Sequence, residues 1–196
     1  SHMEMTDDDT YLWTLPMFHC NGWGHTYAVT GLGATHVCQR AFDAEDTFDT
    51  ICQHFPDYEN SPFVQERFHE DWSKDQVWGW QQNRAVVGHN LKIAWNLMRF
   101  YTQRGKADYE TLARKIAGLM PQHGWDSQRT GWYDVVERER KEGEKFHRFA
   151  FHDRKAWWQQ EQGILAYMIL HGVLGDEEFL RYARESASFY NAWFLD

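Results

Sequence analysis

The chain has 196 residues, a net charge of −9 at pH 7 and 11 tryptophans, a length that suits a single domain with one core. The acidic balance, without any run of Lys or Arg, argues against a nucleic-acid partner or an anionic membrane, and no apolar stretch approaches the roughly 20 residues that a bilayer span needs. Three cysteines without CxxC spacing (Cys20, Cys38 and Cys52) predict reduced thiols and a cytoplasmic location.

The first part of the chain predicts two helices among irregular segments. Ser1-His2-Met3 is typical of what remains after an affinity tag is removed, so we expect one helical domain over residues 4–196. Residues 4–24 show no periodicity and are expected to be irregular. Helical spacing predicts a helix over about residues 25–42 and a second over 44–55, which Pro56 ends.

The second part predicts four longer helices in two antiparallel pairs. Apolar spacing predicts helices over about residues 88–103, 107–120, 154–172 and 177–195, with Pro121 as the end of the second. Residues 124–150 are expected to form a hairpin-like excursion between the pairs. Short turns within each pair, with one long loop between them, predict an all-α fold of antiparallel helical hairpins.

Two of these helices open with polar residues in apolar surroundings. The first carries a stripe of four polar residues that step by three or four and so share one narrow face: His89, Lys92, Asn96 and Arg99. An apolar surround and the nearby Lys92 ammonium would favour a neutral His89 imidazole, the form that acts as a base. The same spacing also describes the solvent-facing edge of an ordinary helix.

The second opening is the tryptophan pair Trp157-Trp158, followed by four polar residues at 159–162. Four successive residues cover all sides of a helical turn, so at least one of them faces inward. An unpaired buried polar group costs about 1–3 kcal/mol, so these inward-facing polar residues need partners. Two helices that begin in this way therefore indicate a shared polar pocket. The alternative is a buried glutamine that satisfies the backbone of a neighbouring loop.

Four segments carry a resemblance to a known family. GHNLKIAWNLMR, from residue 88, is similar to the Gly-His-x-x-Glu-x-x-Trp segment of the N-acylglucosamine 2-epimerase family, which includes cellobiose 2-epimerases and aldose–ketose isomerases. KAWWQQEQGILAY, from residue 155, resembles its Lys-x-Trp-Trp-x-Gln-x-Glu segment. TGWYD at residues 130–134 and ERFHEDW at residues 66–72 occupy the places of two further family motifs, so the resemblance covers roughly residues 63–195.

The resemblance implies part of an (α/α)6 toroid of six helical hairpins, here with a small β-hairpin-like insertion and a sugar in the central cleft. It also implies acid/base chemistry, in which one histidine removes the C2 proton of an open-chain aldose and a second histidine returns a proton. His89 matches the first, and Lys92, in place of a family glutamate, would stabilise an enediolate oxygen. The expected sugar-binding residues are Trp132, Tyr133, Trp157, Trp158, Gln160 and Gln162, the last also in place of a glutamate.

Two other functions stay open. The chain lacks both family glutamates and ends before the second histidine, with His147 and His152 as candidate substitutes, which would fit a carbohydrate-binding module without catalysis. A glycosidase on the related toroid would need two carboxylates that flank the bond. The candidate acids for that chemistry are Glu66, Glu70, Asp71 and Asp134.

The expected partner is a mono- or disaccharide, without a metal or a cofactor. His69-Glu70-Asp71 suggests metal binding, but no second ligand stands at a diagnostic spacing. Half a toroid would expose an aromatic inner layer that a lone protomer rarely tolerates. We therefore expect a homo-oligomer that completes the barrel.

Overall fold

The computed structural model describes residues 6–8, 10–13, 23–38, 43–69, 71–74, 83–150 and 153–195. Its contacts divide the chain into two compact units, residues 1–47 and 48–196, and each is described by itself. The single helical domain expected over residues 4–196 stays a prediction. Among the described residues, no helix combines the length and the apolar character needed to cross a membrane.

The first unit holds β1 (Thr10–Trp13), α1 (Trp23–Leu32) and β2 (Thr35–Cys38), with β1 and β2 paired in parallel. The sequence predicted irregular chain up to residue 24 and helix up to residue 42, and both predictions are wrong where this part of the chain is described. The helix ends early because Gly33 adopts φ +77°, a left-handed conformation that favours glycine and terminates helices. The β-branched residues after it then form a strand.

The second helix, α2 (Ala44–His54), begins in the first unit and continues into the second. Its bounds confirm the predicted helix over residues 44–55. Phe48, the first residue of the second unit, is buried, and its ring packs against Phe100 (centroids 4.2 Å apart) and Tyr109 (6.3 Å). Asp49 adds a hydrogen bond of 2.7 Å from the Tyr109 hydroxyl. Both contacts hold α2 against the following helices.

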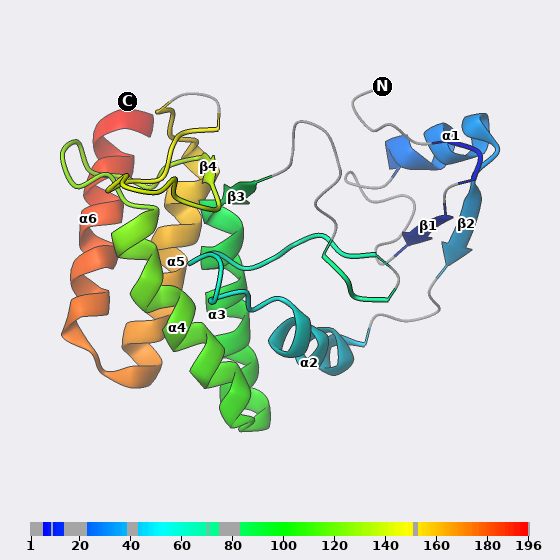
Figure 1. The fold of residues 1–196 in the computed structure, drawn as a ribbon. Coiled ribbons are helices and arrows are strands. Elements are labelled where there is room, and N and C mark those ends of the chain that lie inside the picture. Colours follow the sequence, from blue (N-terminus) through cyan, green and yellow to red (C-terminus); the bar gives the residue numbers. More distant parts are fainter. Residues whose placement is uncertain are drawn as a thin grey trace. The chain divides into compact units, whose positions relative to one another are not determined.

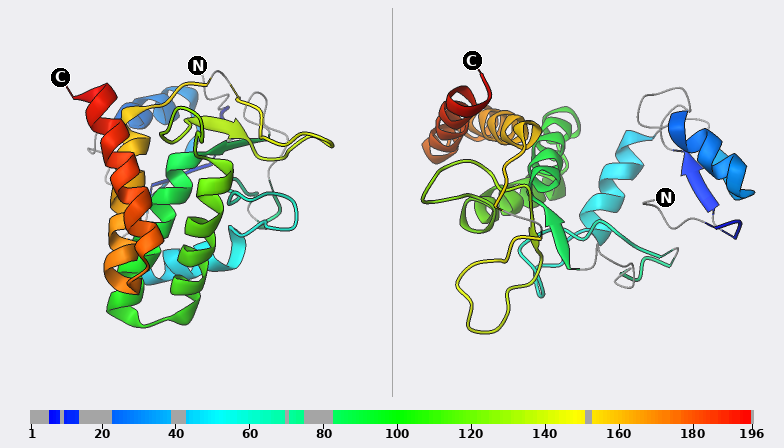
Figure 2. Two further views of the ribbon diagram at one scale, coloured as in Figure 1. Left: turned by 90° about the vertical axis from the view of Figure 1, so that its left-hand side faces the viewer. Right: turned by 90° about the horizontal axis from the view of Figure 1, so that it is seen from above.

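Four long helices form the body of the second unit: α3 (Val87–Arg104), α4 (Ala107–His123), α5 (Trp157–Leu174) and α6 (Glu177–Phe194). Consecutive helices run antiparallel, α3 beside α4 and α5 beside α6, while α3 and α5 lie side by side and run the same way (Figures 1 and 2). These are the two predicted helical hairpins. The faces between them are apolar and fully buried, as at Leu91, Leu97, Met98, Ile116, Met120, Tyr167 and Leu170.

Pro121 lies inside α4 and does not end it, contrary to the sequence prediction. A proline inside a helix leaves the carbonyl four residues earlier without its N–H donor. Here that carbonyl belongs to Ala117, and the buried Tyr167 hydroxyl of α5 donates to it at 2.8 Å. The helix therefore continues to His123, because a side chain from the neighbouring helix replaces the missing backbone donor.

A short antiparallel ladder lies at the end of the unit where α3 and α5 begin (Figure 1). It joins β3 (Arg84–Val86) to β4 (Val135–Glu137), with Ala85 opposite Val136. The chain after β4 folds back on it, since the Ala150 N–H donates to the Val135 carbonyl at 3.1 Å. The hairpin-like excursion predicted for residues 124–150 is thus present, with β3 as an additional partner.

Candidate active site

His89 lies in the first turn of α3, between a carboxylate and an indole. Its Nδ1 atom is 2.6 Å from Oε2 of Glu66, and its ring centroid is 5.7 Å from that of Trp158. The His89 side chain is 45% exposed, so part of the ring is open to solvent. A carboxylate that accepts from Nδ1–H fixes the tautomer and leaves Nε2 as the basic nitrogen.

The charge environment of His89 differs from the sequence prediction. The hydrogen bond that His89 donates to Glu66 is the largest influence and raises the pKa of the imidazole above its ordinary value, whereas burial and the ammonium of Lys92 lower it. The sequence predicted a neutral imidazole from burial and Lys92 alone, without the carboxylate. Both predicted influences are real, but the carboxylate outweighs them because it stabilises the protonated ring directly.

Gly88 lets the first turns of α3 and α5 lie close together. A Cβ at this position would lie 2.6 Å from Cζ3 of Trp158 and 2.9 Å from Cγ of Gln159, closer than real side chains approach. The absence of a side chain therefore lets Trp158 lie against α3 beside His89. Gln159 completes the junction, because its Oε1 accepts from the Gly88 N–H at 2.6 Å and its Nε2 donates to the Asp134 carbonyl at 3.0 Å.

Gln160 and Trp132, both predicted to bind sugar, lie in the core with no exposed surface. Gln160 accepts from the Trp132 N–H at 2.7 Å and donates to the Trp132 carbonyl at 2.8 Å. The Trp132 indole N–H donates to the Ser186 hydroxyl at 2.8 Å. These contacts match the alternative in which buried glutamines satisfy the backbone of a neighbouring loop, and they leave neither side chain a free polar atom toward a ligand.

The other predicted sugar-binding residues differ in position. Trp157 is 55% exposed, next to Trp158 in the first turn of α5. Gln162 is half-buried and accepts from the Trp95 indole N–H at 2.8 Å, which ties α5 to α3. Lys92 is exposed on α3, one turn after His89. Tyr133 lies two residues before β4, and burial and the nearby Asp126 raise its pKa to about 12.

The substitute histidines and acids are mostly engaged elsewhere. His147 is buried and 3.0 Å from His123, and its Nδ1 donates to the Glu137 carbonyl at 2.8 Å. Asp134 is buried, pairs with Arg154 and accepts from Gln159. Asp71 accepts from the Ser73 hydroxyl at 2.6 Å. His152 and Glu70, which the sequence also proposed, lie outside the described residues.

Two residues of the site escaped sequence reasoning in their actual roles. The sequence indicates Glu66 as a candidate glycosidase acid, whereas the ERFHEDW segment, through its family resemblance, is the signal that could place this residue near His89. Gln159 was one of four interchangeable polar residues, because its role depends on which side of α5 faces α3. Neither partner lies within one helical turn of the group it contacts, so periodicity could not pair them.

The arrangement of helices is similar to that in solved structures of a cellobiose 2-epimerase, a D-mannose isomerase and a glycoside hydrolase. The chain matches a cellobiose 2-epimerase from Bacillus thermoamylovorans with a TM-score of 0.61 and 16% identity, over 78% of this chain and 35% of that one. It matches a D-mannose isomerase with a TM-score of 0.55 and 20% identity, over 74% and 35%. A family 76 glycoside hydrolase (mannosidase) from Bacteroides thetaiotaomicron matches with a TM-score of 0.60 and 16% identity, over 77% of this chain and 37% of that one. The fold is therefore part of an (α/α)6 toroid, and the chain spans about a third of these structures.

The family model of N-acylglucosamine 2-epimerase (GlcNAc 2-epimerase) matches residues 33–196. The chain belongs to this family, as the resemblance predicted. A separate likeness is short: a stretch of 44 residues is 54% identical to a probable CoA ligase from Humulus lupulus. That stretch is 22% of this chain and 8% of the ligase, so the chain spans only a small part of the curated relatives that it matches.

Proposed function

We propose that the protein catalyses proton transfer at C2 of an open-chain aldose, with His89 as the acid/base group. The observation that carries the proposal is the hydrogen bond of 2.6 Å between His89 and Glu66, beside Trp158. The His89 ring is partly open to solvent. Neutral His89 takes the C2 proton through Nε2, while Glu66 holds Nδ1–H and stabilises the imidazolium that forms. Lys92 lies one turn away, where its charge favours an enediolate oxygen.

The buried residues of the predicted site act as positioning residues in this proposal. Gln159 and Gln160 hold the backbone around Gly88 and Trp132, and so fix the junction that carries His89 and Trp158. Trp157 and Trp158 supply indole surface at the opening of α5, and an indole suits the apolar face of a sugar ring. A mono- or disaccharide is the proposed substrate.

The direction in which the proton returns separates two reactions. One imidazole on one face of an enediolate can deliver the proton to C1 and produce a ketose, whereas inversion at C2 needs a second acid on the opposite face. Among the described residues, His89 is the imidazole that contacts both Glu66 and Trp158, and this supports a single acid/base group. We therefore propose aldose–ketose isomerisation before 2-epimerisation for the site that His89 forms.

The test is proton exchange in heavy water, followed by NMR on mannose, glucose, N-acetylmannosamine and cellobiose. We expect the wild type to introduce deuterium at C2 or C1, and His89→Ala to lose at least a hundredfold in rate, a typical loss for general acid–base groups. The control is His171→Ala, because His171 lies about 20 Å along the axis of α5 from Trp158, the neighbour of His89. Exchange by the wild type at the rate of His89→Ala would refute the proposal.

A carbohydrate-binding module without turnover is the second candidate, favoured by the exposed Trp157 next to Trp158. It predicts saturable quenching of tryptophan fluorescence by a sugar, with no deuterium incorporated. A glycosidase receives less support, because Glu66 is bonded to His89 and Asp134 to Arg154. These contacts leave neither carboxylate free to flank a glycosidic bond with the other.

A further inference from the structure

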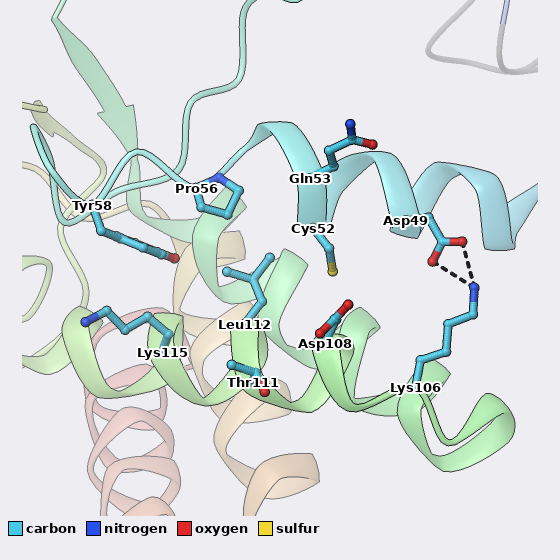
Figure 3. A pocket seen from close by; sticks show the side chains of 10 residues that line it. All are labelled: Asp49, Cys52, Gln53, Pro56, Tyr58, Lys106, Asp108, Thr111, Leu112 and Lys115. Carbon is cyan, nitrogen blue, oxygen red and sulfur yellow. Dashed lines mark hydrogen bonds and ion pairs between the residues drawn. The ribbon is translucent and has the colours of Figure 1, made fainter.

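A groove with a volume of about 850 Å³ separates α2 from the first half of α4 (Figure 3). Its walls are well anchored at one end, where the ammonium of Lys106 lies 2.6 Å from Asp49. It is distinct from the candidate active site, because no residue of that site lines it. The lining residues are Asp49, Cys52, Gln53, Pro56, Tyr58, Lys106, Asp108, Thr111, Leu112 and Lys115.

In one half of this α2–α4 groove, two hydrogen-bond donors have no acceptor among the described residues. The Tyr58 hydroxyl is buried and has no hydrogen-bond partner among the described residues, and it points toward the interior of the groove (Figure 3). The Lys115 ammonium lies 5.4 Å from the centroid of the Tyr58 ring. No carboxylate of the described chain pairs with this ammonium. An acceptor supplied from outside would satisfy both donors, and a buried donor left unpaired costs about 1–3 kcal/mol.

The other half of the groove offers acceptors. Asp108 lies two turns before Lys115 on α4, about 10 Å along the helix axis, and its carboxylate takes no ion-pair partner among the described residues. The Thr111 hydroxyl between them donates to the Ala107 carbonyl at 2.9 Å, so its oxygen is left as an acceptor. Burial raises the pKa of the Cys52 thiol to about 11, so that wall stays uncharged. Leu112 and Pro56 supply apolar surface in the lining of the groove.

We propose that the α2–α4 groove binds a hydroxylated organic anion, that is, a sugar phosphate or a sugar acid. Its anionic group accepts from Lys115 and Tyr58, and its hydroxyl groups donate to Asp108 and Thr111. Its carbon skeleton lies on Leu112 and Pro56. A neutral sugar would leave the two donors poorly paired, and a bare inorganic anion would leave the acceptors unused. The proposal does not rest on turnover at His89.

The test maps binding by amide chemical shifts of the full chain, with glucose 6-phosphate and gluconate as probes and glucose and inorganic phosphate as comparisons. We expect saturable shifts confined to α2 and α4 with one or both organic anions, and at least tenfold weaker binding of glucose and of phosphate. The tighter probe identifies a phosphate or a carboxylate as the preferred group. Equal binding of glucose, equal binding of inorganic phosphate, or no saturable shift with either probe would overturn the proposal.

Two variants connect the binding to the unpaired donors. Lys115→Ala is expected to lose at least tenfold in affinity, whereas Lys141→Ala, an exposed lysine in the loop after β4, is expected to leave the affinity unchanged. Tyr58→Phe should keep or raise the melting temperature without ligand, because it removes an unsatisfied hydroxyl, and should weaken binding. Wild-type affinity in Lys115→Ala contradicts the proposal, as does wild-type affinity in Tyr58→Phe.

Discussion

At the scale of single residues, His89 responds to two charges that act in opposite directions. Glu66 raises the pKa of the imidazole through a hydrogen bond, and Lys92 lowers it through its charge. The carboxylate contacts the ring directly, while the ammonium acts from the exposed surface, where solvent screens it. The carboxylate therefore determines the protonation of the ring, and the lysine moderates it.

Glu66→Gln is expected to lower the pKa of His89, because the amide cannot stabilise the imidazolium as a carboxylate does, while burial and Lys92 continue to lower the pKa. Since the folded-state pKa is raised, the stabilisation by Glu66 is present below the unfolded pKa and is lost as the pH rises through the folded one. The difference in unfolding free energy between wild type and variant should therefore be largest in mild acid and disappear in alkali. An NMR titration of the imidazole and urea unfolding across pH measure both.

Lys92→Gln is the matched control for this titration. It removes a charge that lowers the pKa of His89, so the pKa should rise in this variant and fall in Glu66→Gln. A shift in the same direction in both variants would show that the imidazole responds to a general disturbance of α3 and not to the two charges.

At the scale of elements, the close approach of α5 to the segment between α4 and β4 depends on Gly163. A Cβ on this residue would overlap the indole of Trp132, which is fully buried and bonded to Ser186. The indole therefore packs directly against the α5 backbone. The same principle applies at Gly88, where α3 meets Trp158.

Gly163→Ala is expected to destabilise the fold by about 1–3 kcal/mol, the usual cost of overpacking a core. Gly172→Ala in the same helix is the control, because a Cβ there meets no atom within 4 Å. It should stabilise the helix by roughly 0.5–1 kcal/mol through its better helix propensity. Urea unfolding of both variants provides the comparison, and a neutral Gly163→Ala would contradict the packing described for Trp132.

At the scale of the whole molecule, one face of α5 carries an apolar surface that the described chain leaves exposed. Trp157 is 55%, Leu165 39% and Met168 58% exposed, at helical spacing along a single face. Exposed apolar stripes of this kind commonly mark sites of association. We propose that a second copy of the chain covers this face.

Met168→Lys is expected to shift the protein toward a monomer, because the introduced charge would have to be buried in the contact. Arg184→Glu, an exposed change of charge on α6, serves as the control. Sedimentation velocity over a range of micromolar concentrations measures the oligomeric state. A wild type that stays monomeric throughout this range would exclude the proposed self-association.

Sequence and structure agree best on the helices of the second unit. The apolar periodicity of α3, α4, α5 and α6 predicted their positions to within a few residues, because one buried stripe per helix leaves a clear pattern. The prediction failed after Leu32, where Gly33 redirects the chain into β2. It failed also at Pro121, since the hydroxyl of Tyr167 comes from a different helix.

The sequence by itself determined the helical hairpins, the family and the position of His89 in the first turn of a helix, because periodicity and ordered motifs are local properties of the chain. Only the tertiary structure decided what each polar residue does. It paired His89 with Glu66 and placed Gln160 in the core beside Trp132. The reason is physical: hydrogen bonds between residues far apart in sequence depend on how the helices pack, and no local pattern encodes that packing.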